Sequence, residues 1–462
     1  MTRASPYFDH VDPVALAEAF PVRDAQARLS ALSRDELRAR QEARFAAVLD
    51  FAWKVPFYRR LWGAAGAEPG DVRGLDDLPK LPAYDKSDLM ASVEAHPPLG
   101  DFHGAEAHAP GAAPPMILQT TSGTTGKPQP LLYGPRSREV QNMLLARLYT
   151  LQGMTQADVV HSVYGFGMVN GGHYVRETLL HWIGAQALTA GTGADTRSAQ
   201  QVRLMADFGA TALVGFGDYI KRLAQVAREE GLEPGRDIPI RLISGHLGAE
   251  TAEAMSDAWG GGVAVYDWYG VGDTGAIAGQ GPDRDGLHVM EDAQWLELLD
   301  VETGAPAPEG EIGDMVCTCL YKDDVFPIIR FNSHDVTRMK SGANPLGLPF
   351  RRIEGFLGRS DNMVKLRGVN VYPQGIGALL TAQFDGLTGE YVCRVERRKA
   401  RDEMTVVAEA RHRSPGMIDA LEAVLKERLG VQIGVELTEP GGTAELTQIE
   451  RRQKPIRLID AR

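Results

Sequence analysis

Residues 119–130 read QTTSGTTGKPQP and lie between two apolar runs, residues 116–118 and 131–133. The stretch combines glycines, several hydroxyl side chains and a single lysine, Lys127. Glycines allow backbone N–H groups to converge on an anion, hydroxyl groups add donors, and the lysine adds positive charge. The stretch therefore predicts a loop that binds phosphate groups.

The spacing within this loop excludes one familiar kind of phosphate site. A Walker loop has four residues between its first glycine and its Gly-Lys pair, and a Ser or Thr follows the lysine. Here only two threonines stand between the glycines, and Pro128 follows the lysine. A surface turn rich in Ser, Thr and Gly is the alternative, but such a turn does not require a lysine before a proline. The loop is therefore not that of a P-loop NTPase.

The loop resembles the phosphate loop of the adenylate-forming enzymes, the superfamily of acyl-CoA synthetases and adenylation domains. Later segments continue the resemblance over almost the whole chain, and they are most similar to those of the phenylacetate–CoA ligases. The resemblance implies that the loop binds the phosphates of ATP through Ser122, Gly123, Thr124, Thr125, Gly126 and Lys127.

Length and composition limit the class of protein. A chain of 462 residues with 44% hydrophobic and 24% charged residues is typical of a globular protein of two or three domains. A net charge of −12 argues against nucleic acid or an anionic membrane as a main partner, because both attract a cationic surface. The first residues lack an apolar signal segment, and three cysteines are too few for a disulfide framework. We expect a soluble, cytoplasmic protein.

The hydrophobic pattern predicts an α/β fold with two domains. Short apolar strands alternate with helical patterns between residues 157 and 268, which favours a parallel or mixed sheet covered by helices. Residues 287–336 are rich in strands and turns, which indicates an antiparallel region. We predict a large N-terminal AMP-binding domain of mixed sheets flanked by helices at residues 1–358. A small α+β domain follows at residues 359–462, and the resemblance makes it a mobile lid.

Two segments resemble the superfamily's binding site for the base and the metal. Residues 244–250, SGHLGAE, are similar to the segment that lines adenine, which implies contacts from Gly248, Ala249 and Glu250. Tyr269 and Gly270 begin the second segment, where an aromatic ring offers a stacking face for adenine. The acidic residue of that segment helps to hold magnesium, and this chain has Asp273 where relatives usually have glutamate.

Other segments resemble those that bind the ribose and join the domains. Asp335 follows an apolar strand and matches the aspartate that accepts hydrogen bonds from both ribose hydroxyls, although Asn332 replaces an arginine of many relatives. Within residues 358–370, the resemblance makes Arg359 a catalytic and nucleotide-binding residue and Asp361 the hinge. Near the end of the chain, Lys454 matches the adenylation lysine, whose ammonium bridges the substrate carboxylate and the α-phosphate.

One segment corresponds to the wall of the aryl pocket in the phenylacetate–CoA ligases. Tyr164 keeps an aromatic residue, while Val169 stands at the place of a second aromatic residue and is followed by Asn170. A smaller wall with an amide nearby favours a substituted or polar aryl acid. The same residues could instead be ordinary core packing.

A zinc site is a further hypothesis. Cys317 and Cys319 lie on the same face of an expected strand, and His288 lies in an earlier one. Some relatives bind structural zinc through a histidine, such a cysteine pair and one more cysteine. That last position is Gly281 here, so Asp283, Asp285 or water would have to supply the fourth ligand. Buried strand cysteines without metal are the alternative.

The sequence thus predicts an aryl-acid–CoA ligase that uses ATP, Mg²⁺ and CoA in aromatic acid metabolism. The acid is activated as acyl-AMP with release of pyrophosphate, and CoA then displaces AMP. Two alternatives stay open: transfer of the acyl group to an amine or a carrier protein, and a degenerate relative that only binds nucleotide. The expected partners are small molecules, and a homodimer is left open.

Overall fold

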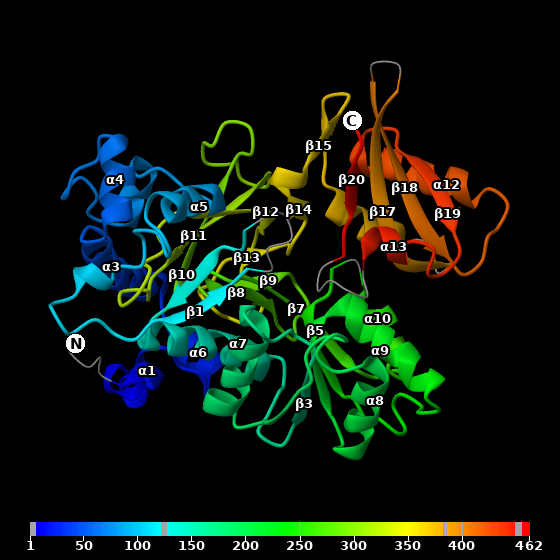
Figure 1. The fold of residues 1–462 in the computed structure, drawn as a ribbon, viewed down its shortest axis with the longest axis horizontal. Coiled ribbons are helices and arrows are strands. Elements are labelled where there is room, and N and C mark those ends of the chain that lie inside the picture. Colours follow the sequence, from blue (N-terminus) through cyan, green and yellow to red (C-terminus); the bar gives the residue numbers. More distant parts are fainter. Residues whose placement is uncertain are drawn as a thin grey trace. The chain divides into compact units, whose positions relative to one another are not determined.

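A computed structural model describes residues 6–121, 127–248, 250–381, 384, 386–398, 401–448 and 455–462. The chain divides into two compact units. The first unit comprises Met1–Ala157, Phe166–Gln186 and Trp268–Gly355, and the second comprises Asp158–Gly165, Ala187–Asp267 and Phe356–Arg462. Figure 1 shows the elements of both units.

The first unit begins with helices whose ends carry local capping signals. The longest of the early helices starts after Ser33, whose hydroxyl accepts from the backbone N–H of Glu36 while the Glu36 carboxylate accepts from the N–H of Ser33. This capping box satisfies two N–H groups at the start of the helix. The helices of this unit are α1 (Pro13–Ala19), α2 (Ala25–Ser30), α3 (Arg34–Ala52), α4 (Pro56–Ala64), α5 (Lys86–Ala95), α6 (Pro135–Leu151) and α7 (Asn170–Thr178).

The strands of the first unit pair antiparallel. A hairpin of β1 (Ile117–Thr120) and β2 (Pro130–Tyr133) flanks the phosphate loop, with Thr120 opposite Pro130. The larger sheet runs in the order β10-β11-β12-β13-β9-β8. Its strands are β8 (Gly275–Gln280), β9 (Leu287–Val289), β10 (Gln294–Leu299), β11 (Ile312–Cys319), β12 (Phe331–Lys340) and β13 (Arg352–Ile353). The antiparallel region predicted from the sequence is confirmed.

The second unit contains the alternating strands and helices that the sequence predicted. Its parallel strands β3 (Val159–Ser162), β5 (Ala212–Phe216), β6 (Leu242–His246) and β7 (Ala264–Val271) pair in that order, and β4 (Gln186–Thr189) lies at the edge. Helices α8 (Ser198–Asp207), α9 (Gly217–Glu229) and α10 (Ala252–Ala258) pack on them through a buried apolar core (Figure 1). Strand β7 begins in this unit and ends in the first.

The C-terminal part of the second unit has a hydrophobic core of its own. A sheet of order β19-β18-β17-β20 is covered by α12 (Met417–Leu429), which buries Leu421 and Leu425. Besides α12, the helices and strands of this part are β14 (Gly358–Arg359), β15 (Val364–Leu366), β16 (Val369–Val371), α11 (Ile376–Thr381), β17 (Leu387–Arg398), β18 (Arg401–Ala410), β19 (Gly434–Thr438), α13 (Ala444–Thr447) and β20 (Leu458–Asp460). The predicted fold class, mixed α/β with an α+β C-terminal part, is therefore confirmed.

None of the helices in the described ranges is both long and apolar enough to cross a bilayer.

Candidate adenylation site

Tyr269 and Asp335 come from two strands of the first unit and meet through a hydrogen bond. The Tyr269 hydroxyl on β7 donates to Asp335 Oδ2 on β12 at 2.8 Å, and Ser333 Oγ lies 3.1 Å from the same hydroxyl. Burial, together with the Asp335 carboxylate, raises the pKa of Tyr269 far above its usual range, so the phenol stays protonated and can donate. The structure thus brings together the residues predicted to bind adenine and ribose.

The backbone around Asp335 is held by a polar cluster that the sequence did not predict. His334 adopts a left-handed conformation with φ of 57°. Its Nε2 lies 2.8 Å from Asp85 Oδ2, at the N-terminus of α5, and its Nδ1 lies 3.5 Å from Asp314 Oδ2 on β11. The Asn332 amide accepts from the backbone N–H of His334 at 2.8 Å and donates to Asp314 Oδ2 at 3.1 Å. Asn332, which replaces an arginine of many relatives, therefore helps to shape the turn before Asp335.

The charge of His334 gives a pH prediction. Hydrogen bonds with Asp314 and then Asp85 raise its pKa to about 10, whereas an unfolded histidine titrates near 6.5. A raised folded pKa stabilises the protein fully below the unfolded value, and the contribution disappears as the pH rises through about 10. We expect His334→Gln to lower the free energy of unfolding by about 1–2 kcal/mol at neutral pH, between the values for exposed and buried pairs.

Denaturant titrations of the wild type and His334→Gln at about pH 7, 9 and 10.5 would measure this difference, which should shrink toward the highest pH. His412→Gln, at an exposed position, serves as the matched control. A difference that does not depend on pH would contradict the ionic role of His334.

Asp273, the predicted magnesium residue, lies in the turn between β7 and β8. Its side chain is buried, and Oδ1 accepts from Gln129 Nε2 at 2.7 Å. Burial raises its pKa to about 6, against the opposing effects of Lys322 and the Gln129 hydrogen bond. The turn itself requires a glycine before it, because a Cβ on Gly270 would lie 2.4 Å from the carbonyl oxygen of Gly275. The close approach of Gly275 therefore requires a glycine at position 270, independently of the predicted nucleotide contact.

Lys322 lies behind this turn and was missed from the sequence. Its ammonium is fully buried and donates to the backbone carbonyls of Leu132 and Asp273, each at 3.3 Å. The Tyr133 hydroxyl also donates to the carbonyl of Gly272 at 2.7 Å. Strand β2, which follows the phosphate loop, is thus bonded at several points to the turn that carries Asp273.

The donor set near Asp273 fits magnesium bound together with a nucleotide. Mg²⁺ prefers oxygen ligands and commonly uses one or two carboxylates together with substrate phosphates and water. Within the described ranges, no group of three His, Cys, Asp or Glu side chains is arranged as a complete metal cage. A single carboxylate beside the phosphate loop is sufficient for this kind of site.

In the second unit, aromatic side chains gather where parallel strands end. Tyr164 follows β3, and its ring centroid lies 5.3 Å from Phe216 at the end of β5 and 6.0 Å from His246 at the end of β6. The rings of Phe216 and His246 are 5.2 Å apart. Open α/β sheets bind ligands at the carboxyl ends of their strands. Phe216 and His246 were not predicted as pocket residues; their places at the ends of apolar strands were the available signal.

The other two predicted aryl-pocket residues lie in the first unit. Val169 forms a parallel bridge with Thr120, next to the hydrogen bond from Thr120 N–H to the Met168 carbonyl at 2.6 Å. Asn170 begins α7, and its Oδ1 accepts from the buried Arg138 at 2.7 Å. The Asn170 amide is therefore used in part to satisfy a buried guanidinium.

The predicted adenine-lining segment, residues 244–250, begins in β6 and continues beyond its end. Gly248 has φ of +62°, a conformation that favours glycine, and it is exposed. Glu250 is buried, and both of its carboxylate oxygens accept from Lys221 Nζ, at 2.7 and 2.6 Å. Its carboxylate thus has a protein partner, and its nucleotide contact stays a prediction.

Two further predicted residues form an ion pair. Arg359 Nε and Nη2 donate to the Asp361 carboxylate at 2.8 and 2.6 Å. The predicted catalytic arginine and the predicted hinge residue therefore hold each other in this structure. Lys127, at the end of the phosphate loop, is exposed.

Several predicted site residues lie outside the described residues. These are Ser122, Gly123, Thr124, Thr125, Gly126, Ala249 and Lys454.

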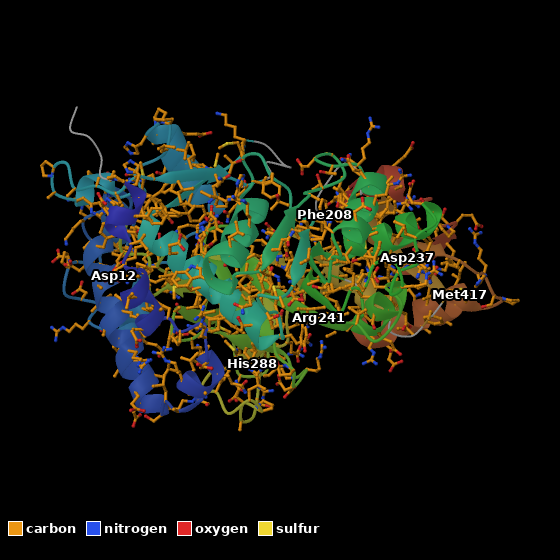
Figure 2. All side chains as sticks on the ribbon, turned by 90° about the horizontal axis from the view of Figure 1, so that it is seen from below. Asp12, Phe208, Asp237, Arg241, His288 and Met417 are labelled. Atoms are coloured by element: carbon orange, nitrogen blue, oxygen red, sulfur yellow. The ribbon has the colours of Figure 1, made fainter. Side chains whose placement is uncertain are left out.

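The structure does not bring together the residues of the zinc hypothesis. His288 on β9 (Figure 2) has Asp283 Oδ1 at 2.9 Å from Nε2 and Asn344 Nδ2 at 2.9 Å from Nδ1. Cys317 and Cys319 lie on β11, which is separated from β9 by β12 and β13, and the Cys317 thiol donates to Gln294. In the part of the chain that the structure describes, these side chains do not form a metal-binding group. The two thiols are buried strand residues.

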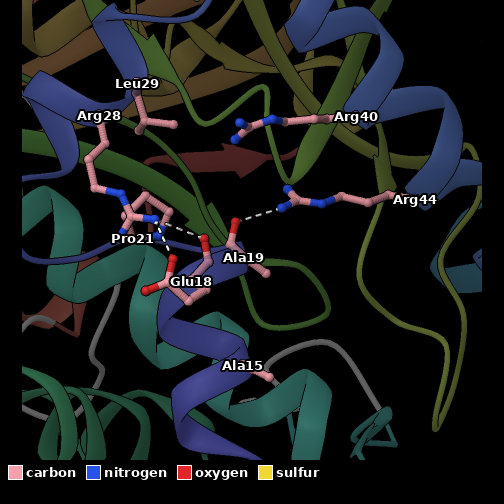
Figure 3. A pocket seen from close by; sticks show the side chains of 8 residues that line it. All are labelled: Ala15, Glu18, Ala19, Pro21, Arg28, Leu29, Arg40 and Arg44. Atoms are coloured by element: carbon pink, nitrogen blue, oxygen red, sulfur yellow. Dashed lines mark hydrogen bonds and ion pairs between the residues drawn. The ribbon is translucent and has the colours of Figure 1, made fainter.

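A pocket of about 600 Å³ lies among α1, α2 and α3 and contains none of the predicted site residues (Figure 3). Two of its three arginines have partners: Arg28 pairs with Glu18 at 3.1 Å, and Arg44 donates to the Ala19 carbonyl at 2.6 Å. We therefore place the candidate site at Tyr269, Asp335 and Asp273 rather than in this pocket.

Comparison with known proteins identifies the family of this chain. Residues 23–318 match the model of the AMP-binding enzymes, and residues 368–462 match the model of the AMP-binding enzyme C-terminal domain. A phenylacetate–coenzyme A ligase of Thermus thermophilus is 32% identical over 448 residues, which cover 90% of this chain and 95% of that protein. A phenylacetate–coenzyme A ligase of Pseudomonas putida is 31% identical over 430 residues, which cover 88% of this chain and 92% of that protein.

Solved structures show the same fold. A 2-hydroxyisobutyryl-CoA ligase in the postadenylation state, in complex with 2-HIB-AMP, superposes with a TM-score of 0.81 at 28% identity, over 94% of this chain and 91% of that one. An open conformation of a 2-hydroxyisobutyryl-CoA ligase with 2-HIB-AMP and CoA gives a TM-score of 0.67 at 27% identity, over 92% and 91%.

The chain therefore belongs to the family of AMP-binding enzymes. It is an AMP-forming acid–CoA ligase, which activates a carboxylic acid as acyl-AMP before CoA takes the acyl group.

Proposed function

We propose that this ligase activates an aryl acid of the phenylacetate type, with ATP as the adenylyl donor and CoA as the acceptor. The hydrogen bond between the Tyr269 hydroxyl and Asp335 is the main structural support for ATP binding in this proposal. It fixes a ring with a stacking face beside a carboxylate that suits a vicinal diol. The match to two phenylacetate–coenzyme A ligases over most of the chain supports the choice of acid and acceptor.

The aryl part of the proposal rests on the aromatic cluster of Tyr164, Phe216 and His246. Its rings gather at the carboxyl ends of β3, β5 and β6, where the apolar body of an aryl acid could pack against them. The His246 imidazole adds a polar group among the rings. The cluster therefore suits an aryl acid better than a long unbranched chain.

In the first half-reaction, a carboxylate oxygen of the acid attacks the α-phosphorus of ATP, and the bond to the bridging oxygen breaks to release pyrophosphate. We assign Lys454 to the negative charge that develops at the α-phosphate and residues 122–127 to the leaving phosphates. Asp335 orients the ribose, and the Tyr269 ring holds the adenine. Mg²⁺, which Asp273 would hold together with the phosphates, supplies charge neutralisation.

In the second half-reaction, the thiol of CoA attacks the acyl carbonyl and AMP leaves. We propose that residues 1–358 and 359–462 act as separate domains and that the chain turns about Asp361 between the two steps. Most of the rate enhancement then comes from positioning and charge stabilisation, because the mixed anhydride supplies the activation. Because ATP and CoA are cytoplasmic metabolites, we propose that the protein acts in the cytoplasm.

Acid-dependent exchange of labelled pyrophosphate into ATP tests the proposal over a panel of phenylacetate, hydroxyphenylacetates, benzoate and 2-hydroxyisobutyrate. Products are then analysed with and without CoA. We expect the fastest exchange with a phenylacetate and thioester only when CoA is present. Fastest exchange with 2-hydroxyisobutyrate would overturn the aryl assignment. Exchange without thioester would favour an amine or a carrier protein as acceptor, and no exchange with any acid would favour a nucleotide-binding protein without catalysis.

A further inference from the structure

A buried group of ion pairs in the second unit joins helix α9 to strand β17 and to the segment before β20. Arg457 is 9% exposed. Its guanidinium donates to Asp218 on α9 at 3.1 Å, to Glu390 on β17 at 2.9 Å and to the Tyr391 carbonyl at 2.7 Å. The Tyr391 ring lies 4.6 Å from the guanidinium carbon, which adds a cation–π contact. One arginine thus connects elements that are far apart in the sequence.

A second contact lies one helical turn along α9. Lys221 follows Asp218 by three residues, so both side chains lie on the same face of the helix. Lys221 Nζ donates to both Glu250 oxygens and, at 2.8 Å, to the backbone carbonyl of Thr388 on β17. Gly389 has φ of +94°, and a Cβ there would lie 2.8 Å from Glu250 Oε1. Two residues of this segment are therefore linked to side chains of α9, Thr388 directly to Lys221 and Glu390 through Arg457. Position 389, between them, requires a glycine.

The charges of this group do not cancel. Three carboxylates, of Asp218, Glu250 and Glu390, face two cations, and each side chain is 18% exposed or less. Burial raises the pKa of Glu390 to about 7. Burying ion pairs costs most of the attraction they gain, so they stabilise poorly and are better suited to selecting one arrangement over another.

The related 2-hydroxyisobutyryl-CoA ligase exists in more than one arrangement, since two of its structures superpose on this chain with TM-scores of 0.81 and 0.67 at nearly equal identity. Arg457 lies three residues after Lys454 along the chain. A contact that fixes Arg457 therefore limits where the preceding segment can reach.

We propose that the Asp218–Arg457 ion pair and the Lys221–Thr388 hydrogen bond are a clasp for the adenylation half-reaction. The clasp holds the C-terminal part against α9 while acyl-AMP forms, and it opens before CoA attacks. Asp218, Lys221 and Arg457 are positioning residues, because they act through the segment that carries Lys454 and not on the substrate. The inference rests on the proposed function above.

The test measures the two half-reactions separately in the variants Asp218→Asn and Lys221→Gln. Pyrophosphate exchange reports adenylation, with the acid that gives the fastest wild-type exchange. Thioester formation from the purified acyl-AMP of that acid and CoA reports the second step without adenylation. We expect each variant to slow exchange about tenfold, the loss of roughly one charged hydrogen bond, while thioester formation stays within about twofold. Asp218→Glu, which keeps the charge, should restore part of the exchange rate.

Glu229→Gln on the exposed side of α9 is the matched control, and both of its rates should equal those of the wild type. Circular dichroism of each variant checks that it is folded. Equal losses in both half-reactions, or wild-type exchange in both variants, would overturn the clasp and leave the proposed function intact. Failure of the wild type to exchange with any acid would instead overturn both.

Discussion

Lys454→Ala is expected to lower acid-dependent pyrophosphate exchange by about 100- to 1,000-fold, the usual cost of removing one charge-stabilising group from a transition state. In the role proposed for Lys454, the ammonium offsets negative charge that grows at the α-phosphate as the carboxylate attacks. We propose no comparable role for it when CoA attacks a preformed acyl-AMP. Thioester formation or hydrolysis from supplied acyl-AMP should therefore remain largely intact.

ATP affinity separates this role from a simple binding role. Equilibrium titration with a fluorescent ATP analogue should give Lys454→Ala a Kd within a few-fold of the wild type. Lys426→Ala, at an exposed position of α12, is the matched control and should behave as the wild type in both assays. A variant that fails to bind ATP at all would contradict the assignment of Lys454 to the transition state.

Asp335→Asn is expected to raise the KM for ATP about 10- to 100-fold with a smaller change in kcat. Hydrogen bonds to a charged group are worth about 1.5–3 kcal/mol, and the asparagine keeps the shape while it loses the charge. The variant also changes the acceptor of the Tyr269 hydroxyl, which the structure places 2.8 Å from Asp335 Oδ2. Steady-state kinetics at several ATP concentrations, with the acid saturating, measure the effect.

Ser333→Ala provides the comparison for this prediction, because Ser333 lies 3.1 Å from the same tyrosine hydroxyl but carries no charge. Its KM for ATP should rise no more than about threefold, as expected for one neutral hydrogen bond. The effect of Asp335→Asn on the KM should be smaller with 2′-deoxy-ATP, which lacks one of the two hydroxyls. An equal effect with both nucleotides would contradict a contact between Asp335 and the 2′-hydroxyl.

The sequence was most informative where a local pattern carries its own geometry. Alternating apolar strands and helical patterns predicted the parallel strands β3, β5, β6 and β7. Tyr269 and Asp335 were identified because both lie in motifs attached to strands. Their hydrogen bond could not be predicted, since it depends on which strands bring them together.

The residues that the sequence missed are those whose role depends on tertiary placement. Lys322 is a single lysine in an ordinary segment, and only the fold shows that it is buried against two backbone carbonyls. Phe216 and His246 come from different strands and meet because those strands are parallel neighbours. The same holds for the zinc hypothesis: the resemblance grouped His288 with Cys317, while β12 and β13 lie between their strands.

Because every cysteine is buried, the reactivity of the thiols reports how often each unit opens. Cys317 and Cys319 belong to the first unit and Cys393 to the second, and all three are buried. A thiol-alkylating reagent can therefore modify the chain only in molecules whose unit has opened, by local or global unfolding. Peptide mapping after timed exposure would give a separate rate of alkylation for the cysteines of each unit. A bound nucleotide should lower the rate of alkylation of Cys317 and Cys319.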